Sequence, residues 1–267
     1  MQEEIAPLLV LGDCIEHMKS IDSGSVDLVL CDPPYGTTTC KWDNVLELGP
    51  LWATLNRVIK PNGAIVLFAT QPFSSQLVNS NLKGFKYSWY WKKSKASNFP
   101  QAPNMPLKII EEILVFSNGV VCHASQVGDR RMPYYPQGIT KGVKIIKQRR
   151  NTSHLNYHRE TQAQHVGGYR CKNENYPQTL LNFKSENGHH PTQKPVTLLE
   201  YLIRTYTQAG DLVLDFTMGS GSTGVACKKS HRRFIGIEKD PGYFEIAEER
   251  IRSAEGAQLV FPGLNFL

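Results

Sequence analysis

Apolar and polar positions show two kinds of periodicity along the first 119 residues, one typical of strands and one typical of helices. Consecutive or alternating apolar residues predict four strands, at Val26–Cys31, Ala64–Ala69, Phe85–Trp91 and Ile110–Phe116. Apolar residues at helical spacing predict a helix over Val45–Ile59. The sequence Pro61-Asn62-Gly63 is expected to end that helix.

The same alternation of helices and strands returns after Pro195. It predicts helices at Val196–Gln208, Ser222–Ser230 and Pro241–Ser253, and strands at Leu212–Asp215 and Arg233–Glu238. Asp240 stands directly before Pro241, as an N-cap acid before a first-turn proline, so we interpret Asp240 as structural. Apolar strands separated by helices predict the α/β class, with a doubly wound, mostly parallel sheet covered on both faces.

Residues 120–190 interrupt this alternation of helices and strands. They are rich in Gln, Asn, Arg, Tyr, Gly and His and show little periodicity. We therefore expect one domain built from residues 1–119 and 191–267, into which residues 120–190 are inserted.

The composition is that of an ordinary globular protein, with 40% hydrophobic and 20% charged residues among 267. The N-terminus, Met1-Gln2-Glu3-Glu4, lacks the basic start of a secretory signal. No apolar stretch approaches the roughly 20 residues of a membrane span. We expect a soluble, cytoplasmic protein without a membrane segment.

Cysteine and histidine usage gives no metal signature. The six cysteines include no C-x-x-C pair, and Cys31 and Cys227 lie in apolar segments, which predicts buried free thiols. His154 and His158 have i,i+4 spacing, but no third ligand stands near them in the sequence. We predict no metal.

The net charge of +6 is concentrated in one segment. Between Gly128 and Lys184, eleven lysines and arginines stand against three acids, so the rest of the chain is slightly acidic. Such an excess favours a polyanion-binding surface, although a solvated basic loop would carry the same charge. The candidate residues for such a surface are Arg130, Arg131, Lys147, Arg149 and Arg150.

A glycine turn follows the strand that ends at Asp215. Gly219, Gly221 and Gly224 have G-x-G-x-x-G spacing before a helix, and Glu238 closes the next strand nineteen residues after Gly219. In this arrangement glycines allow close approach of a ligand and the acid binds a ribose hydroxyl, which favours an adenosine-containing ligand. A tight strand–helix turn with a surface glutamate is the structural alternative.

The strand Val26–Cys31 ends in Asp32-Pro33-Pro34-Tyr35. Prolines remove competing N–H donors, and the residues before them are held extended. The Asp32 carboxylate and the Pro33 carbonyl then form a rigid acceptor pair beside an aromatic ring, which suits the exocyclic amino group of a flat base. Standing alone, this sequence is more often only a turn.

Together these motifs resemble the permuted β-class amino-methyltransferases of DNA. "CDPPYG", a basic recognition region, "HHPTQKPVTLLEYLI" and "DFTMGSGSTG" occur here in the order typical of that family. The resemblance implies a Rossmann-like, circularly permuted methyltransferase fold, with residues 120–190 as the target-recognition region. It also implies methyl transfer from S-adenosylmethionine to duplex DNA after base flipping.

Site residues follow from the resemblance. It implies Asp32, Pro33, Pro34 and Tyr35 as the catalytic set. It places the cofactor at Asp13, Asp32, Lys194, Asp215, Thr217, Gly219, Ser220, Gly221 and Glu238. Within this set, Glu238 would bind the ribose, Asp13 would lie near the adenine ring and Lys194 would bind the methionine carboxylate. The family often has Asp-Pro-Phe where this chain has Asp215-Phe216-Thr217, which leaves open which side chain lines the cofactor site.

Several alternatives stay open at this point. Asp at position 32 is usual in family members that act on adenine N6, but cytosine N4 is a second target, and RNA or a protein glutamine are others. Two alternatives have a different function: a nicotinamide-dependent oxidoreductase and a non-catalytic DNA-binding protein. The sequence leaves undecided whether the protein forms a homodimer or has a cognate restriction endonuclease.

Overall fold

The computed structural model describes residues 8–35, 46–122, 127–146, 169–186, 188 and 193–255. The chain divides into two compact units, Met1–Tyr135 with Thr179–Leu267, and Pro136–Gln178. The second unit lies within the predicted inserted segment, and its recognition role stays a prediction.

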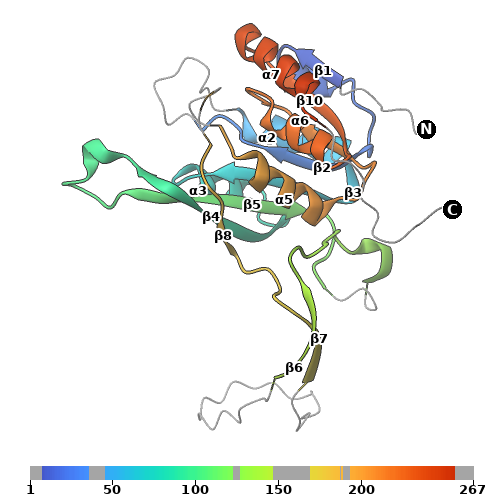
Figure 1. The fold of residues 1–267 in the computed structure, drawn as a ribbon. Coiled ribbons are helices and arrows are strands. Elements are labelled where there is room, and N and C mark those ends of the chain that lie inside the picture. The colour runs from blue at the N-terminus through green and yellow to red at the C-terminus, as the bar shows by residue number, and fades with distance from the viewer. Residues whose placement is uncertain are drawn as a thin grey trace, which may run out of the picture. The chain divides into compact units, whose positions relative to one another are not determined.

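A central sheet organises the first unit (Figure 1). Within its described residues the sheet has eight strands in the order β1-β10-β9-β2-β3-β5-β4-β8. Neighbours from β1 to β3 are parallel, β5 is antiparallel to both β3 and β4, and β8 is parallel to β4. The strands are β1 (Leu8–Leu11), β2 (Val26–Cys31), β3 (Ile59–Ala69), β4 (Phe85–Ser97), β5 (Lys108–Ser117), β8 (Leu180–Asn182), β9 (Leu212–Asp215) and β10 (Arg233–Glu238).

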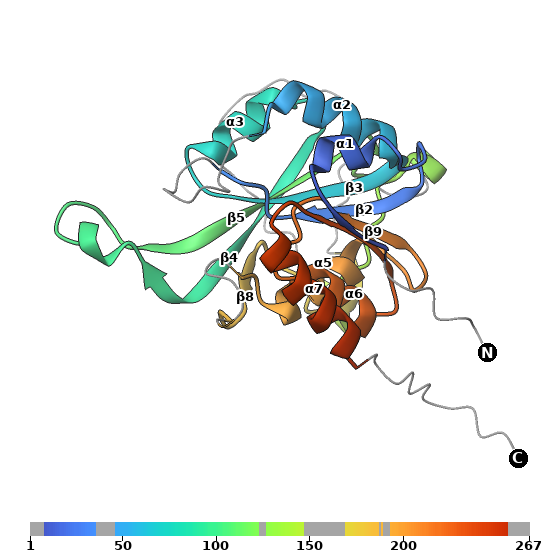
Figure 2. The same cartoon turned by 90° about the horizontal axis from the view of Figure 1, so that it is seen from above.

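Helices cover both faces of the sheet (Figure 2). One face carries α1 (Cys14–Met18), α2 (Leu48–Val58) and α3 (Phe73–Ser80), and the other carries α5 (Val196–Tyr206), α6 (Ser222–Lys229) and α7 (Pro241–Ser253). Alternate residues of β2 enter different cores: Leu28 and Leu30 pack with α5, α6 and α7, while Val29 and Cys31 pack with α1, α2 and α3. The predicted doubly wound, mostly parallel α/β sheet is confirmed.

The predicted start of one strand is wrong. Helix α2 ends at Val58, one residue before its predicted end, but β3 begins at Ile59 and not at Ala64, so Pro61 lies inside the strand. The β2–β3 register jumps from Val26↔Ile59 to Leu28↔Ala64, which leaves the residues around Pro61 as a bulge. A bulge tolerates proline because it needs no ladder N–H there.

Two tryptophans of β4 are core residues. Trp89 and Trp91 are both buried. The Trp89 Nε1 donates to the buried Tyr206 hydroxyl at 2.6 Å, and the Trp91 Nε1 donates to the Phe183 carbonyl at 3.0 Å. These bonds satisfy the indole donors and fasten α5 and the segment after β8 to the sheet.

Strands β6 (Thr140–Ile146) and β7 (Tyr169–Glu174) form an antiparallel pair in the second unit. Lys147, Arg149 and Arg150 lie outside the described residues. Among the helices that the structure describes, none is long and apolar enough to cross a membrane. Within the same residues no group of three His, Cys, Asp or Glu side chains is arranged to hold a metal ion.

Candidate active site

The carboxyl ends of the parallel strands bring the predicted motifs together. Asp32 follows β2, Asp215 ends β9 and Glu238 ends β10. Leu11 of β1 pairs with Glu238, and the Gly12 N–H donates to the Glu238 carbonyl at 2.8 Å. We call this side of the sheet the carboxyl edge and the opposite side the amino edge. In doubly wound sheets ligands bind at the carboxyl edge.

Both oxygens of the Asp32 carboxylate are engaged. The Tyr35 hydroxyl donates to Oδ1, and the Lys194 ammonium donates to Oδ2. Tyr35 also packs on Phe73 of α3, with ring centroids 5.3 Å apart. Burial, followed by the charges of Asp32 and Glu111, raises the pKa of Tyr35 well above its ordinary value, so its hydroxyl stays a donor.

Lys194 is buried and bridges two carboxylates. Besides Asp32, its Nζ lies 2.8 Å from Oε1 of Glu111 on β5 and 5.1 Å from the ring centroid of Phe68. Burial alone would lower the pKa of Lys194, but the charges of Asp32 and Glu111 outweigh it and raise that pKa. The Lys194 ammonium therefore keeps its charge at neutral pH.

Glu111 is a site residue that sequence reasoning missed. It is buried, and its Oε2 lies 3.8 Å from the Lys93 ammonium of β4. The signal in the sequence was two acids, Glu111 and Glu112, inside an otherwise apolar strand. Alternation sends Glu112 to the opposite face, where it accepts from Gln71 at 3.3 Å.

The glycine turn is anchored by Glu238. Its Oε2 accepts from the Gly219 N–H at 2.8 Å, and its Oε1 accepts from the Lys239 and Asp240 N–H groups at 2.9 and 2.8 Å. Gly219 and Gly221 have φ of +51° and +78°, the left-handed region that favours glycine. The turn is therefore held from the end of the neighbouring strand.

Two glycines of the motif also serve helix packing. A Cβ on Gly221 would lie 2.9 Å from the Ala247 Cα in α7, and one on Gly224 would lie 2.3 Å from the Ile251 Cδ1. The absence of side chains at these two positions therefore allows the close contact between α6 and α7, in addition to the turn geometry.

Thr217 joins the two motifs. Its Oγ1 donates to the Asp32 carbonyl at 3.1 Å and lies 2.9 Å from the Cys31 Sγ, while its N–H donates to Asp215 Oδ1 at 3.2 Å. Phe216 is buried in the core on the α1–α3 side. Of the residues after Asp215, it is therefore Thr217 that faces the site.

Asp215 is a buried acid suited to a cation. Burial, with a further contribution from Asp32, raises its pKa to about 6, against hydrogen bonds from Thr223, Cys31 and the Thr217 N–H that lower it. An ammonium group placed beside it would favour its ionised form. The α-ammonium of a bound amino acid moiety fits this site.

Asp13 and Ser220 have structural partners as well. Asp13 caps α1 by accepting from the Ile15 and Glu16 N–H groups at 3.0 and 3.3 Å. Ser220 is buried, and its Oγ accepts from Arg250 of α7 at 2.8 Å. Asp240 is the N-cap of α7, as predicted, and accepts from the Tyr243 N–H at 3.0 Å.

Arg130 and Arg131 lie away from this cluster. The Asn62 side chain donates to the Arg131 carbonyl at 3.0 Å, and Asn62 stands near the start of β3. Both arginines are exposed and sit at the amino edge. Their predicted contact with DNA stays a prediction, and it would involve a surface remote from Asp32.

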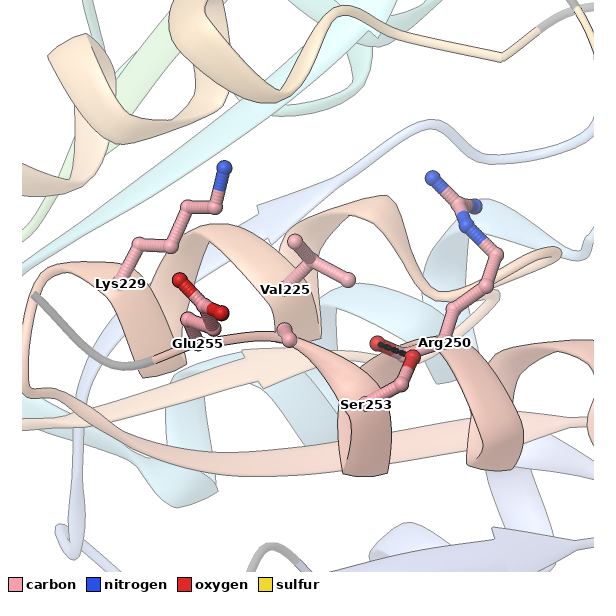
Figure 3. Close-up of a pocket in the computed structure, with 6 residues that line it drawn as sticks. Val225, Lys229, Arg250, Ser253 and Glu255 are labelled. Atoms are coloured by element: carbon pink, nitrogen blue, oxygen red, sulfur yellow. Dashed lines mark hydrogen bonds between the residues drawn. The ribbon is translucent and has the colours of Figure 1, made fainter.

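A surface hollow of about 370 Å³ lies between α6 and α7. It is lined by Val225, Lys229, Arg250, Ser253, Ala254 and Glu255 (Figure 3). None of these residues belongs to the Asp32–Tyr35 turn or to the glycine turn, and Lys229 and Ser253 stand at the C-terminal ends of their helices. We do not assign the ligand site to this hollow.

Comparison with known proteins gives a consistent picture. A family model described as DNA methylase matches residues 26–249. The type II methyltransferase M.HpaI of Haemophilus parainfluenzae is 27% identical, over 92% of this chain and 74% of its own. The type II methyltransferase M2.DpnII of Streptococcus pneumoniae is 26% identical, over 92% of this chain and 90% of its own.

Solved structures agree. The crystal structure of the M1.HpyAVI–SAM complex matches with a TM-score of 0.60 and 25% identity, over 92% of this chain and 100% of that one. The PvuII DNA methyltransferase, which is cytosine-N4-specific, matches with a TM-score of 0.59 and 19% identity, over 91% and 85%. The second likeness concerns the fold alone.

Gly221→Ala is expected to destabilise the protein beyond the cost of its backbone conformation. A left-handed φ costs a non-glycine residue about 1–2 kcal/mol, and the new Cβ would also push against the α7 backbone. Gly24→Ala is the matched control, because Gly24 has a φ of +64° with no atom within 4 Å of the added Cβ. Urea unfolding should show a larger loss for Gly221→Ala, and equal losses would contradict the packing role.

Proposed function

This chain belongs to the DNA methylase family and is an S-adenosylmethionine-dependent DNA methyltransferase, and we propose that its target is the N6 amino group of adenine in duplex DNA. The observation that carries the proposal is the Asp32 carboxylate, which is held at the carboxyl edge on a rigid Pro-Pro turn. The Asp32 carbonyl accepts a hydrogen bond from Thr217, which lies between β9 and the glycine turn. A carboxylate at this position is also what the family resemblance associates with adenine.

Asp32 and Pro33 act on the target amine. The Asp32 carboxylate and the Pro33 carbonyl accept the two amino N–H groups of the flipped base, Pro34 stiffens the turn, and the Tyr35 ring offers a stacking face. Two acceptors favour a more pyramidal nitrogen, whose lone pair is then less delocalised into the ring. Asp32 orients the amine without first removing a proton. As the nitrogen lone pair bonds to the methyl carbon, the C–S bond electrons would stay on sulfur as a neutral thioether, and the proton of the positively charged nitrogen passes to the Asp32 carboxylate that accepts its hydrogen bond.

Bound S-adenosylmethionine supplies an electrophilic methyl group on its sulfonium. The Asp215 carboxylate would bind its α-ammonium, and the Gly219–Gly221 turn would accommodate the methionine part. Glu238 and Asp13 would stand at the ribose and the adenine ring. Thr217 and Ser220 support this region through the strand end and α7.

We infer that Asp32 exchanges partners when it accepts the amine. Its two oxygens already accept from Tyr35 and Lys194, and release of Lys194 frees the Oδ2 lone pair that faces this ammonium. A buried ammonium left without a carboxylate would cost several kcal/mol. Glu111 removes that obstacle, because Lys194 keeps a carboxylate at 2.8 Å when it releases Asp32. Released in this way, Lys194 could also reach the methionine carboxylate, the role that the family resemblance suggests.

The first test is methyl transfer to unmethylated duplex DNA, with the nucleosides analysed by mass spectrometry after digestion. We expect N6-methyladenine from the wild type and none from Asp32→Ala, which removes an acceptor on the amine. N4-methylcytosine would keep the mechanism and overturn the choice of base. No product on DNA despite S-adenosylmethionine binding would overturn the substrate.

Glu111→Gln is expected to lower kcat by about tenfold or more, equivalent to roughly 1.4 kcal/mol or more, because Lys194 then stays on Asp32. The affinity for S-adenosylmethionine, measured by calorimetry, should change less than kcat. Glu112→Gln makes the same charge change at the next position on the opposite face and should retain activity. Equal kcat values for the two variants, at similar melting temperatures, would refute the role of Glu111.

Affinity for S-adenosylmethionine should rise from pH 5 to pH 7. The pKa of Asp215 is raised to about 6, so the side chain is largely neutral at pH 5 and ionised at pH 7, where it attracts the ammonium. The increase is limited to about tenfold per pH unit below that pKa. Calorimetry on Asp215→Asn should give weaker binding with a flatter pH dependence. A wild-type affinity that does not change over this range would argue against the contact.

A further inference from the structure

The strands β4 and β5 continue beyond the rest of the sheet. The last pair between β3 and β5 is Ala69↔Glu112, and the last pair between β8 and β4 is Asn182↔Lys92. Past these points, among the described strands, β4 and β5 pair only with each other. We call residues 94–110 the hairpin arm. It projects from the sheet in both views of the fold (Figures 1 and 2).

The arm leaves the sheet at the carboxyl edge. Ala69 is the carboxyl end of β3, and β5 begins beyond it, so the arm starts on the side where Asp32 lies. At its root, the Lys93 ammonium lies 3.8 Å from the Glu111 carboxylate that binds Lys194. From Lys92 to Ser97, five steps of about 3.3 Å carry the strand roughly 16 Å outward. That length is comparable to the major groove of DNA, about 12 Å wide.

The tip of the arm is an ordered turn. Asn98 has a φ of +72°, a short 3-10 helix spans Phe99–Gln101, and the Ser97 Oγ donates to the Lys108 carbonyl at 3.2 Å. The arm holds apolar side chains in solvent: Phe99 and Met105 near the tip are 64% and 44% exposed, and Ile110 near the root is 48% exposed. A two-stranded hairpin is only marginally stable in water by itself. The large exposed apolar area of the arm therefore indicates that a partner covers it.

The charge of the arm and its root indicates what kind of partner binds there. Residues 92–110 contain Lys92, Lys93, Lys95 and Lys108 and no aspartate or glutamate. Lys92, Lys95 and Lys108 are exposed. A purely basic surface with apolar side chains at its tip, beginning beside the amine-binding carboxylate, fits a polyanion whose bases become accessible next to the target.

We propose that the hairpin arm is a DNA-contacting element that grips the duplex beside the target base. Lys95 and Lys108 contact phosphates, and Phe99 packs against the bases at the place that the target base vacates. Apolar side chains inserted between base steps stabilise such opened duplexes. The inference rests on the proposed function only in that duplex DNA is the substrate, and it does not depend on which base is methylated.

The test compares DNA affinity across salt concentrations for the wild type and for Lys95→Gln/Lys108→Gln. Lys83→Gln/Lys86→Gln is the matched control, because these lysines lie at the other end of the same sheet region, before and at the start of β4. Fluorescence anisotropy should show weaker binding for the arm variant. Its slope of log K against log salt should be shallower by about 1.8, for two lost phosphate contacts. The control should keep the wild-type slope.

Phe99→Ala tests the apolar tip with 2-aminopurine at the target position. The fluorescence increase on base flipping should be reduced, while affinity for S-adenosylmethionine stays unchanged. If the wild type binds and methylates DNA but both arm variants match it in slope and flipping signal, the arm is not a DNA contact. A change in oligomeric state without a change in DNA binding would assign the arm to a second copy of this chain. A wild type that does not bind DNA would overturn the proposed function itself, which separates the two failures.

Discussion

The arrangement of the site depends on one buried ammonium held between two carboxylates. Lys194 comes from the segment before α5, Asp32 from the end of β2 and Glu111 from β5, so three distant parts of the chain meet at one nitrogen. An ammonium at this depth is tolerated only with its charge compensated. The same requirement fixes the position of each partner. It gives Asp32 a defined orientation in the absence of substrate and gives Lys194 a second carboxylate when Asp32 is needed elsewhere.

A second set of bonds makes one site from the two ends of the chain. Thr217 connects the start of the glycine turn to the Asp32 carbonyl, and Glu238 holds the Gly219 N–H from the neighbouring strand. Because these strands are parallel neighbours, their carboxyl ends lie at one edge whatever their order in the sequence. Placing the glycine motif last therefore leaves the geometry of the site unchanged.

Two groups of exposed basic residues lie at opposite edges of the sheet. Arg130 and Arg131 stand at the amino edge, whereas the exposed lysines of the hairpin arm begin at the carboxyl edge beside Asp32. Summed charge along the sequence does not show this difference, because the two lysines of the arm, Lys95 and Lys108, are far fewer than the basic residues between Gly128 and Lys184.

The class of the sheet and most of its strands and helices follow from the sequence alone. Periodicity and glycine, proline and capping signals are local, and β9, β10 and α7 have the bounds that they predict. Long-range pairings, in contrast, depend on the folded chain: the Glu111–Lys194 contact, the hydrogen bond from Thr217 to the Asp32 carbonyl, and the bulge that includes Pro61 in β3. A buried acid in a strand gives no sign of its partner until the fold brings them together, because the partner is chosen by the burial of both charges and not by their neighbours along the chain.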